Sequence, residues 1–210
     1  MKVIREIISL NIDRHPDFTY YEAILDIIEE NVNRNPDIAI ESCKSLIEGI
    51  SKSILKALDN TYNSAEVDSL DFQPLFKRML LKLSEYNSEI ESDFVNRACS
   101  LIHLLGEIRN KRGDISHGKL APKEVFSTKQ FSNLVSQTTE GITFFVLKHF
   151  YSIDLSYQKE VEYKDNMDFN VWLDEANPFG NLSYSKALFQ QDNISYVEQL
   201  TDYKASQGEI

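Results

Sequence analysis

Cysteine is scarce in this chain of 210 residues, which contains only Cys43 and Cys99. The two lie far apart and have no metal-ligand spacing, so we expect no metal site built on cysteine. Each falls on the apolar face of a predicted helix, which predicts two buried free thiols rather than a disulfide. A chain of this length, with 42% hydrophobic residues, can form one large domain or one domain with an appendage.

Long apolar runs are also missing. No stretch approaches the roughly 20 apolar residues that a membrane-spanning helix needs, so we expect no membrane partner. At the N-terminus, Lys2, Arg5 and Glu6 interrupt the apolar core that a signal peptide would need. These absences predict a cytoplasmic protein.

Positive charge is outweighed, because the formal net charge is -11. This balance argues against a broad surface that coats nucleic acid, since such binding depends on Lys and Arg at the phosphates. Residues 107–124 are an exception, with five Lys or Arg against three acids. The local basic window suits a selective contact with one phosphate or one RNA region, whereas the acidic remainder suits a cationic protein partner. Composition leaves both open.

Glycine and proline are few, with seven and five residues, and the apolar residues between them recur at helical spacing almost throughout. The predicted fold class is therefore all-α. Ser127 to Gln130 have the form of a capping box. Residues 152–184 are richer in Tyr, Asn and Asp, and a short strand near 157–163 is an alternative there. The predicted helices are 2–14, 18–33, 36–60, one that follows Pro74, 93–112, 127–151 and 185–204.

One stretch at the polar end of a predicted helix carries most of the chemistry. Arg109, Asn110 and Arg112 precede Gly113, and His117 follows. Arginine binds phosphate oxygens with a fork of donors, and histidine exchanges a proton near neutral pH. In an unbroken helix the first arginine and the histidine would lie about 12 Å apart along the axis, so a turn at the glycine is needed to bring them together. The alternative is an ordinary helix C-terminus, where basic residues favour the negative end of the dipole.

The succession Arg-Asn, a basic residue, Gly-Asp and then His-Gly resembles the signature of the abortive-infection C-terminal family. That family belongs to the HEPN superfamily of all-α domains, many of which are metal-independent endoribonucleases. Residues 39–55 are similar to its earlier helix, including a step at Leu46-Ile47-Glu48 and a lysine at Lys52. The resemblance continues downstream to Tyr151. It implies three regions: an N-terminal helical extension (1–35), a HEPN-like helical bundle (36–151) and a mostly helical C-terminal appendage (152–210).

The resemblance implies an endoribonuclease of a bacterial abortive-infection, toxin–antitoxin or anti-phage defence system, with RNA as substrate and no cofactor or metal. His117 would move the proton of the 2′-hydroxyl or of the leaving oxygen, Arg109 would stabilise the phosphorane, and Asn110 would orient the histidine or the backbone. A homodimer with two such motifs in one cleft is expected, as is a cognate antitoxin or defence-system protein. Asp114 is a candidate supporting residue.

The spacing departs from the superfamily pattern, in which four to six residues separate the arginine from the histidine. Seven residues lie between Arg109 and His117, and four between Arg112 and His117. Arg109 is preferred because the Arg-Asn pair matches the family there, and Arg112 stays an alternative. Glu48 and Lys52 are candidates to support the cleft from the facing helix; alternatively they form an exposed ion pair four residues apart.

The remaining features have ordinary explanations. His103 lies within an apolar helical stripe and is expected to be an interior or boundary residue. His15, which precedes a proline turn, and His149, near a helix end, are expected to have no functional role. Residues 168–175 combine acids with the only tryptophan, and three interpretations stay open: a metal site, a docking surface and packing of the tail. Two rivals to the enzyme also stay open. One is a catalytically inactive HEPN-like module that binds RNA or protein as a sensor or scaffold, and the other is a neutralising partner of a basic toxin.

Overall fold

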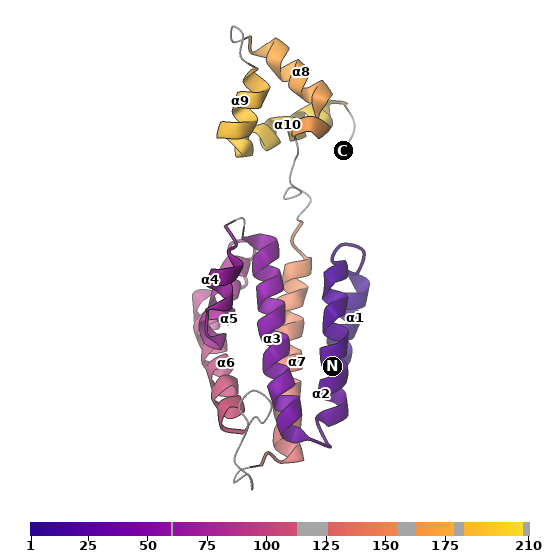
Figure 1. Ribbon diagram of the computed structural model, residues 1–210, viewed down its shortest axis with the longest axis vertical. Helices are drawn as coiled ribbons and strands as arrows, with labels where there is room; N and C mark the ends of the chain where they lie inside the picture. Colours follow the sequence, from indigo (N-terminus) through magenta and orange to yellow (C-terminus); the bar gives the residue numbers. More distant parts are fainter. Residues whose placement is uncertain (60, 113–125, 155–162, 179–182, 208–210) are drawn as a thin grey trace. The chain divides into compact units, whose positions relative to one another are not determined.

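The computed structural model describes residues 1–59, 61–112, 126–154, 163–178 and 183–207. Within these ranges every regular element is a helix and none is a β-strand, as expected for an all-α fold. The chain divides into two compact units, Met1–Ile153 and Asp154–Ile210 (Figure 1). Each unit has its own buried core.

The first unit is a helical bundle. In Figure 1, α3 and α7 run side by side, with α1 and α2 on one side and α4, α5 and α6 on the other. Helix α3 contacts α2, α5, α6 and α7, and α1 contacts α7. Residues 1–35, which the sequence analysis sets apart as an extension, therefore pack on the same bundle. The elements are α1 (Lys2–Leu10), the 3₁₀ helix η1 (Pro16–Tyr21), α2 (Glu22–Asn31), α3 (Pro36–Leu58), α4 (Ser64–Asp68), α5 (Phe72–Ser84), α6 (Ser92–Arg112) and α7 (Lys129–Tyr151).

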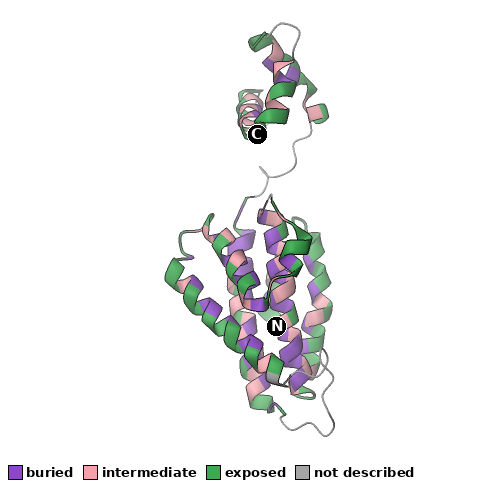
Figure 2. Cartoon of the chain, turned by 60° about the vertical axis from the view of Figure 1, so that its left-hand side comes forward, coloured by how far each residue is buried: buried purple, intermediate pink, exposed green. Residues whose placement is uncertain are grey.

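Helix α3 is the centre of this bundle because apolar side chains cover much of its surface. Pro36 opens it at a position where a missing backbone N–H costs nothing. Leu46, Ile50 and Ile54 are all at most 2% exposed. Burying a side chain of this size contributes about 1.5–3 kcal/mol to folding. The buried residues of the bundle lie mainly on the inward sides of its helices (Figure 2).

The first two helices are shorter than their apolar spacing predicts. Helix α1 ends at Leu10 and not at residue 14. At this end the side chain of Asn11, the C-cap residue, donates a hydrogen bond to the carbonyl of Ile7 (2.8 Å). The predicted helix 18–33 begins as the 3₁₀ helix η1 before α2 starts at Glu22. Pro16 is the first residue of η1, a position where its missing backbone N–H costs no hydrogen bond.

The start of α7 differs by one residue from the predicted capping box. Thr128 is the N-cap, and its Oγ1 accepts the N–H of Phe131 at 3.2 Å. Ser127 lies outside the helix, and its backbone N–H donates to Asp37 at 3.1 Å. The long-range bond to Asp37 sets this register, and sequence spacing could not reveal it.

The ring of Tyr21, the last residue of η1, packs closely against Gly49 of α3. A Cβ atom on Gly49 would lie 2.7 Å from Cε1 of the Tyr21 ring. That ring is buried, and its hydroxyl shares a 2.7 Å hydrogen bond with Ser53. Glycine is therefore needed at position 49 for the tyrosine to sit against α3.

The two cysteines are free and buried, as predicted. Burial raises the pKa of the Cys43 thiol to about 12 and also raises that of Cys99. Leu101, which the helical pattern assigns to the buried stripe of α6, is instead 37% exposed, and Leu104 is 50% exposed. Over the part of the chain that the structure describes, none of the helices has the length and apolar character needed to cross a bilayer.

The second unit contains the short helix η3 (Tyr163–Asp165) and the helices α8 (Met167–Ala176), α9 (Tyr184–Gln191) and α10 (Asn193–Gln207). Its core consists of Phe169, Leu173, Tyr196 and Leu200, each at most 3% exposed. The Tyr196 hydroxyl donates to the buried side chain of Asn170. The small apolar core of this unit thus contains one buried hydrogen bond between side chains.

The predicted helix 185–204 is in fact two helices with a break at Asp192. The carboxylate of Asp192 accepts hydrogen bonds from the backbone N–H and the hydroxyl of Ser195, at 3.1 and 2.8 Å. An aspartate that satisfies the first N–H groups of a new helix competes with continuation of the previous one. The alternative strand near 157–163 falls almost entirely outside the described residues.

Candidate active site

Arg109 lies in the last turn of α6 and is held by a carboxylate from α3. Its Nη2 donates to Oε1 of Glu41 at 2.9 Å. The two side chains are 12% and 7% exposed, so the ion pair is largely removed from water. Burial of this kind costs desolvation free energy that only a well-formed pair recovers. Glu41 therefore fixes both the position and the orientation of the guanidinium.

The rest of the guanidinium is only partly used. Nη1 donates to Oδ1 of the adjacent Asn110 at 3.1 Å. The Nε atom of Arg109 is buried and has no hydrogen-bond partner among the described residues. Arginine has five N–H donors, so the contacts with Glu41 and Asn110 leave donors for a further acceptor.

A second carboxylate of α3 binds the backbone just after residues 113–125 in the sequence. Asp37 is four residues before Glu41, hence one turn away on the same side of α3. It is 8% exposed and accepts the backbone N–H of Ser127 at 3.1 Å. Arg109 and Ser127 are thus both attached to the first turns of α3, one on each side of the stretch that contains His117 in the sequence.

The described residues include only part of the predicted site. His117 and Asp114 lie outside the described residues, as does Gly113, where the turn is predicted. Arg112 ends α6, and only its backbone is described. The contact between histidine and arginine, and the choice between Arg109 and Arg112, therefore stay predictions.

Glu48 and Lys52 lie farther along α3 and have other partners. Glu48 pairs with Lys44 at 2.8 Å, and Lys52 pairs with Asp68 of α4 at 2.6 Å. The alternative of an ion pair between the two is therefore wrong. Seven and eleven residues separate them from Glu41, which corresponds to about 10 and 16 Å along a helix axis. Within the described structure they are not brought to Arg109, and a role at a cleft stays a prediction.

The site residues that the sequence analysis missed are Asp37 and Glu41. Both are buried carboxylates among apolar neighbours, such as Ile40 and Cys43, on a helix that is otherwise a core element. Two acids one turn apart at the start of a strongly apolar helix were the available signal, because buried carboxylates require partners.

The three ordinary histidines fall into different environments. His103 is 61% exposed and lies 4.0 Å from Glu107, so the prediction of an interior or boundary position is wrong for it. His149 is buried and hydrogen-bonds with Asn87 through Nδ1. His15 is partly buried against aromatic rings, including Phe150 at 4.7 Å between ring centroids, and burial lowers its pKa.

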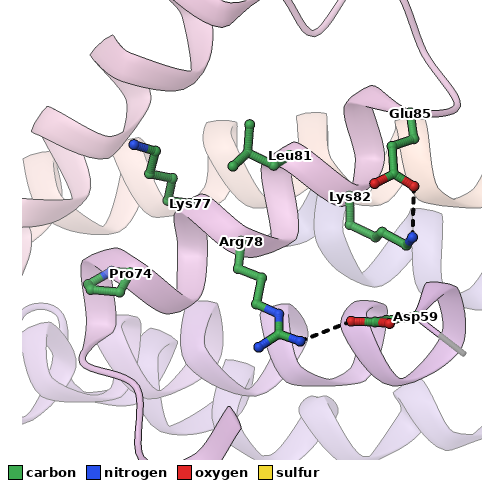
Figure 3. Close-up of a pocket in the computed structure, with 7 residues that line it drawn as sticks. All are labelled: Asp59, Pro74, Lys77, Arg78, Leu81, Lys82 and Glu85. Carbon is green, nitrogen blue, oxygen red and sulfur yellow. Dashed lines mark hydrogen bonds and ion pairs between the residues drawn. The ribbon is translucent and has the colours of Figure 1, made fainter. Parts of the chain in front are cut away.

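A cavity of about 380 Å³ lies at the other end of α3 (Figure 3). Two of its three cations are already paired: Arg78 with Asp59 at 3.1 Å and Lys82 with Glu85 at 2.7 Å. Asp59 follows Glu41 by eighteen positions, or about 27 Å of helix, so this cavity is separate from the Arg109 site. Its lining residues are Asp59, Pro74, Lys77, Arg78, Leu81, Lys82 and Glu85.

Among the described residues, no group of three or more His, Cys, Asp or Glu side chains has a metal-binding arrangement. Of the interpretations left open for residues 168–175, a metal site thus finds no support in the described side chains. One of the acids there, Asp174, takes part in local hydrogen bonds. Asp174 accepts the backbone N–H of Ser185 at 2.6 Å and the hydroxyl of Ser183 at 2.8 Å.

Comparison with known proteins adds one finding. Residues 19–150 match the Abi_C family, which is described as a HEPN-like domain, and this range is more than half of the chain. It contains Arg109, Glu41 and the segment with His117, and it confirms the resemblance that the sequence motifs carry. The match begins within the segment predicted as an extension. No curated protein and no solved structure matches the chain.

Proposed function

We propose that this chain, which belongs to the family of HEPN-like domains, is a metal-independent endoribonuclease of a bacterial abortive-infection, toxin–antitoxin or anti-phage defence system. The observation that carries the proposal is Arg109, whose guanidinium is oriented by the buried carboxylate of Glu41 at the end of α6. His117 follows eight positions later. A fixed cation and an imidazole are the groups that cleavage of a phosphodiester without a metal requires.

The proposed reaction is an internal displacement within the RNA. The 2′-oxygen attacks the neighbouring phosphorus, and the bond from phosphorus to the 5′-oxygen breaks. His117 takes the proton from the 2′-hydroxyl or gives one to the leaving oxygen. Arg109 stabilises the negative charge that develops on the phosphorane. The products are a 2′,3′-cyclic phosphate and a 5′-hydroxyl.

Glu41 is a positioning residue in this scheme. It accepts one hydrogen bond from Nη2 of Arg109, and Asn110 accepts one from Nη1. The second hydrogen on each terminal nitrogen supplies the fork that fits two phosphate oxygens. The Arg109 side chain therefore loses its conformational freedom when the protein folds and not when RNA binds. The entropy cost does not add to the barrier of the reaction, which favours the transition state.

A homodimer is part of the proposal. Leu101 and Leu104 are exposed on α6, within two or three turns of Arg109. Exposed leucines along one helix are typical of an interface. Two copies that meet along α6 would bring both arginines to one groove.

The test is cleavage of total bacterial RNA by the purified chain in EDTA, with the new ends analysed chemically. We expect cyclic phosphate and 5′-hydroxyl ends, and a loss of rate of about 100-fold or more for His117→Ala. Arg109→Lys keeps the charge but loses the fork, and it should be slower by about tenfold or more. Arg97→Ala is the matched control, because Arg97 is also on α6 but is 80% exposed. Cleavage only when Mg²⁺ is added would overturn the mechanism.

A second function is favoured by two specific observations. The net charge of -11 opposes broad RNA binding, and Glu41 already neutralises Arg109. These features suit an inactive module that binds a protein partner or one selected RNA region as a sensor or scaffold, or that neutralises a basic toxin. Expression in a bacterial host separates the two functions. An enzyme slows growth and loses this effect with His117→Ala, whereas a binding module affects growth equally in both forms.

A further inference from the structure

Helix α8 of the second unit has apolar residues on two opposite sides. Phe169 and Leu173 are 1% exposed and belong to the core of the unit. Met167 and Val171, one turn apart, are 56% and 53% exposed. A helix that is apolar on a second side is typical of one that has a second partner.

Trp172, the only tryptophan of the chain, joins this outer side. It is 46% exposed, yet its ring is held in place by the core. It stacks on Phe169 with 5.9 Å between ring centroids and lies 5.2 Å from the ring of Tyr203. A large aromatic ring that is already immobilised loses little entropy when it is covered, and such rings dominate binding energy at interfaces.

The charge around this side selects the partner. Residues 154–210 contain eleven Asp or Glu and four Lys or Arg, so most of the excess negative charge of the chain lies here. Asp168 precedes the tryptophan by one turn, and Glu175 follows it by three residues, so both lie on its side of α8. Both are exposed. Nucleic acid and anionic lipid would be repelled by this field.

We propose that the α8 outer face, formed by Met167, Asp168, Val171, Trp172 and Glu175, binds a basic amphipathic segment of a protein partner. The apolar side chains of that segment cover Val171 and the tryptophan ring. Its Lys or Arg residues meet the two carboxylates. Complementary charge sets the orientation and the association rate, and the buried aromatic ring supplies most of the affinity.

The test uses the full chain and an 18-residue synthetic peptide of Leu and Lys at helical spacing. Because Trp172 is the only tryptophan, its fluorescence reports on this face alone. We expect a saturable blue shift with one peptide per chain. A peptide with Glu in place of Lys, and one with Ser in place of Leu, should each bind at least tenfold more weakly.

Variants separate the α8 outer face from general attraction to an acidic protein. Val171→Asp and Glu175→Lys should each weaken binding by about tenfold, whereas Glu198→Lys on the exposed side of α10 should change it less than twofold. Circular dichroism checks that each variant is folded. The proposal is overturned if Glu198→Lys weakens binding as much as Glu175→Lys. It is also overturned if the tryptophan emission of the chain alone shifts on dilution, which would show that a second copy covers the face.

Discussion

At the residue scale, the ion pair between Arg109 and Glu41 should contribute far more than an exposed pair. We predict that Arg109→Met costs about 3–5 kcal/mol of unfolding free energy, because a carboxylate that is 7% exposed loses its cation. Adding Glu41→Gln to that variant should restore a large part of the loss. Urea unfolding of both single variants and the double variant gives the coupling energy.

The control for this cycle lies on the same helix. Arg97 and Asp93 of α6 also form an ion pair, at 3.0 Å, but their side chains are 80% and 74% exposed. Water and salt screen such a pair, so its coupling energy should be below about 1 kcal/mol. Equal coupling in the two cycles would contradict the view that Glu41 holds a buried guanidinium.

The same pair shows how far the sequence alone could lead to the site. The sequence singles out Arg109 because the Arg-Asn pair at the end of an apolar helix matches the family signature there. Glu41 is 68 positions away, and its role depends on how α3 packs against α6, which spacing along one helix does not encode. The interior or boundary position expected for His103 is wrong for a related reason. An apolar stripe on a helix does not show which of the residues at its margin are exposed to water.

A pH dependence is expected from Asp59, the C-cap residue that follows α3. Hydrogen bonds from the side chain and backbone of Thr61, and one from Arg78, lower the pKa of this carboxyl although its burial opposes them. A carboxyl whose pKa is lowered in the folded state stabilises the protein at a pH above the ordinary pKa of that group. The stabilisation is lost as the pH falls through the pKa of the folded state. Asp59→Asn should therefore lower the unfolding free energy at pH 7 by about 1 kcal/mol. In urea titrations the difference from the parent should shrink towards pH 3, and a difference that grows there would contradict the assignment.

At the element scale, two glycines inside long helices make a matched pair. Gly49→Ala in α3 should destabilise the protein by about 1–3 kcal/mol, because its Cβ would lie 2.7 Å from the ring of Tyr21. Gly141→Ala in α7 should stabilise it by about 0.5–1 kcal/mol, since no described atom lies within 4 Å of that Cβ and alanine favours a helix. Thermal unfolding measures both. If both variants shift the melting temperature in the same direction, the contact of the Tyr21 ring with Gly49 does not constrain position 49.

Helical spacing predicted the long elements well and the junctions poorly. Helices α3, α6 and α7 each bury a long apolar stripe, so their periodicity persists over many turns. The break at Asp192 and the cap at Thr128 depend on single hydrogen bonds from side chains. Such bonds stop or start a helix locally without changing the apolar pattern around it.

At the scale of the whole molecule, the chain consists of two compact units with separate cores. The second unit has few residues, and its described part has four side chains in the buried apolar core. A unit of this size buries a smaller fraction of its surface on folding than a unit the size of the first, so we expect it to be the less stable of the two. Two units with separate cores need not unfold together.

We therefore predict two transitions in urea. Trp172 reports the second unit alone, whereas most of the circular dichroism at 222 nm comes from the helices of the first. The fluorescence transition should occur at lower urea. Leu173→Ala removes a core side chain of the second unit and should move only that transition, by about 2–5 kcal/mol in free energy. Leu46→Ala does the same in α3 and should move only the dichroism transition. If each variant moves both curves together, the two cores unfold as one cooperative system.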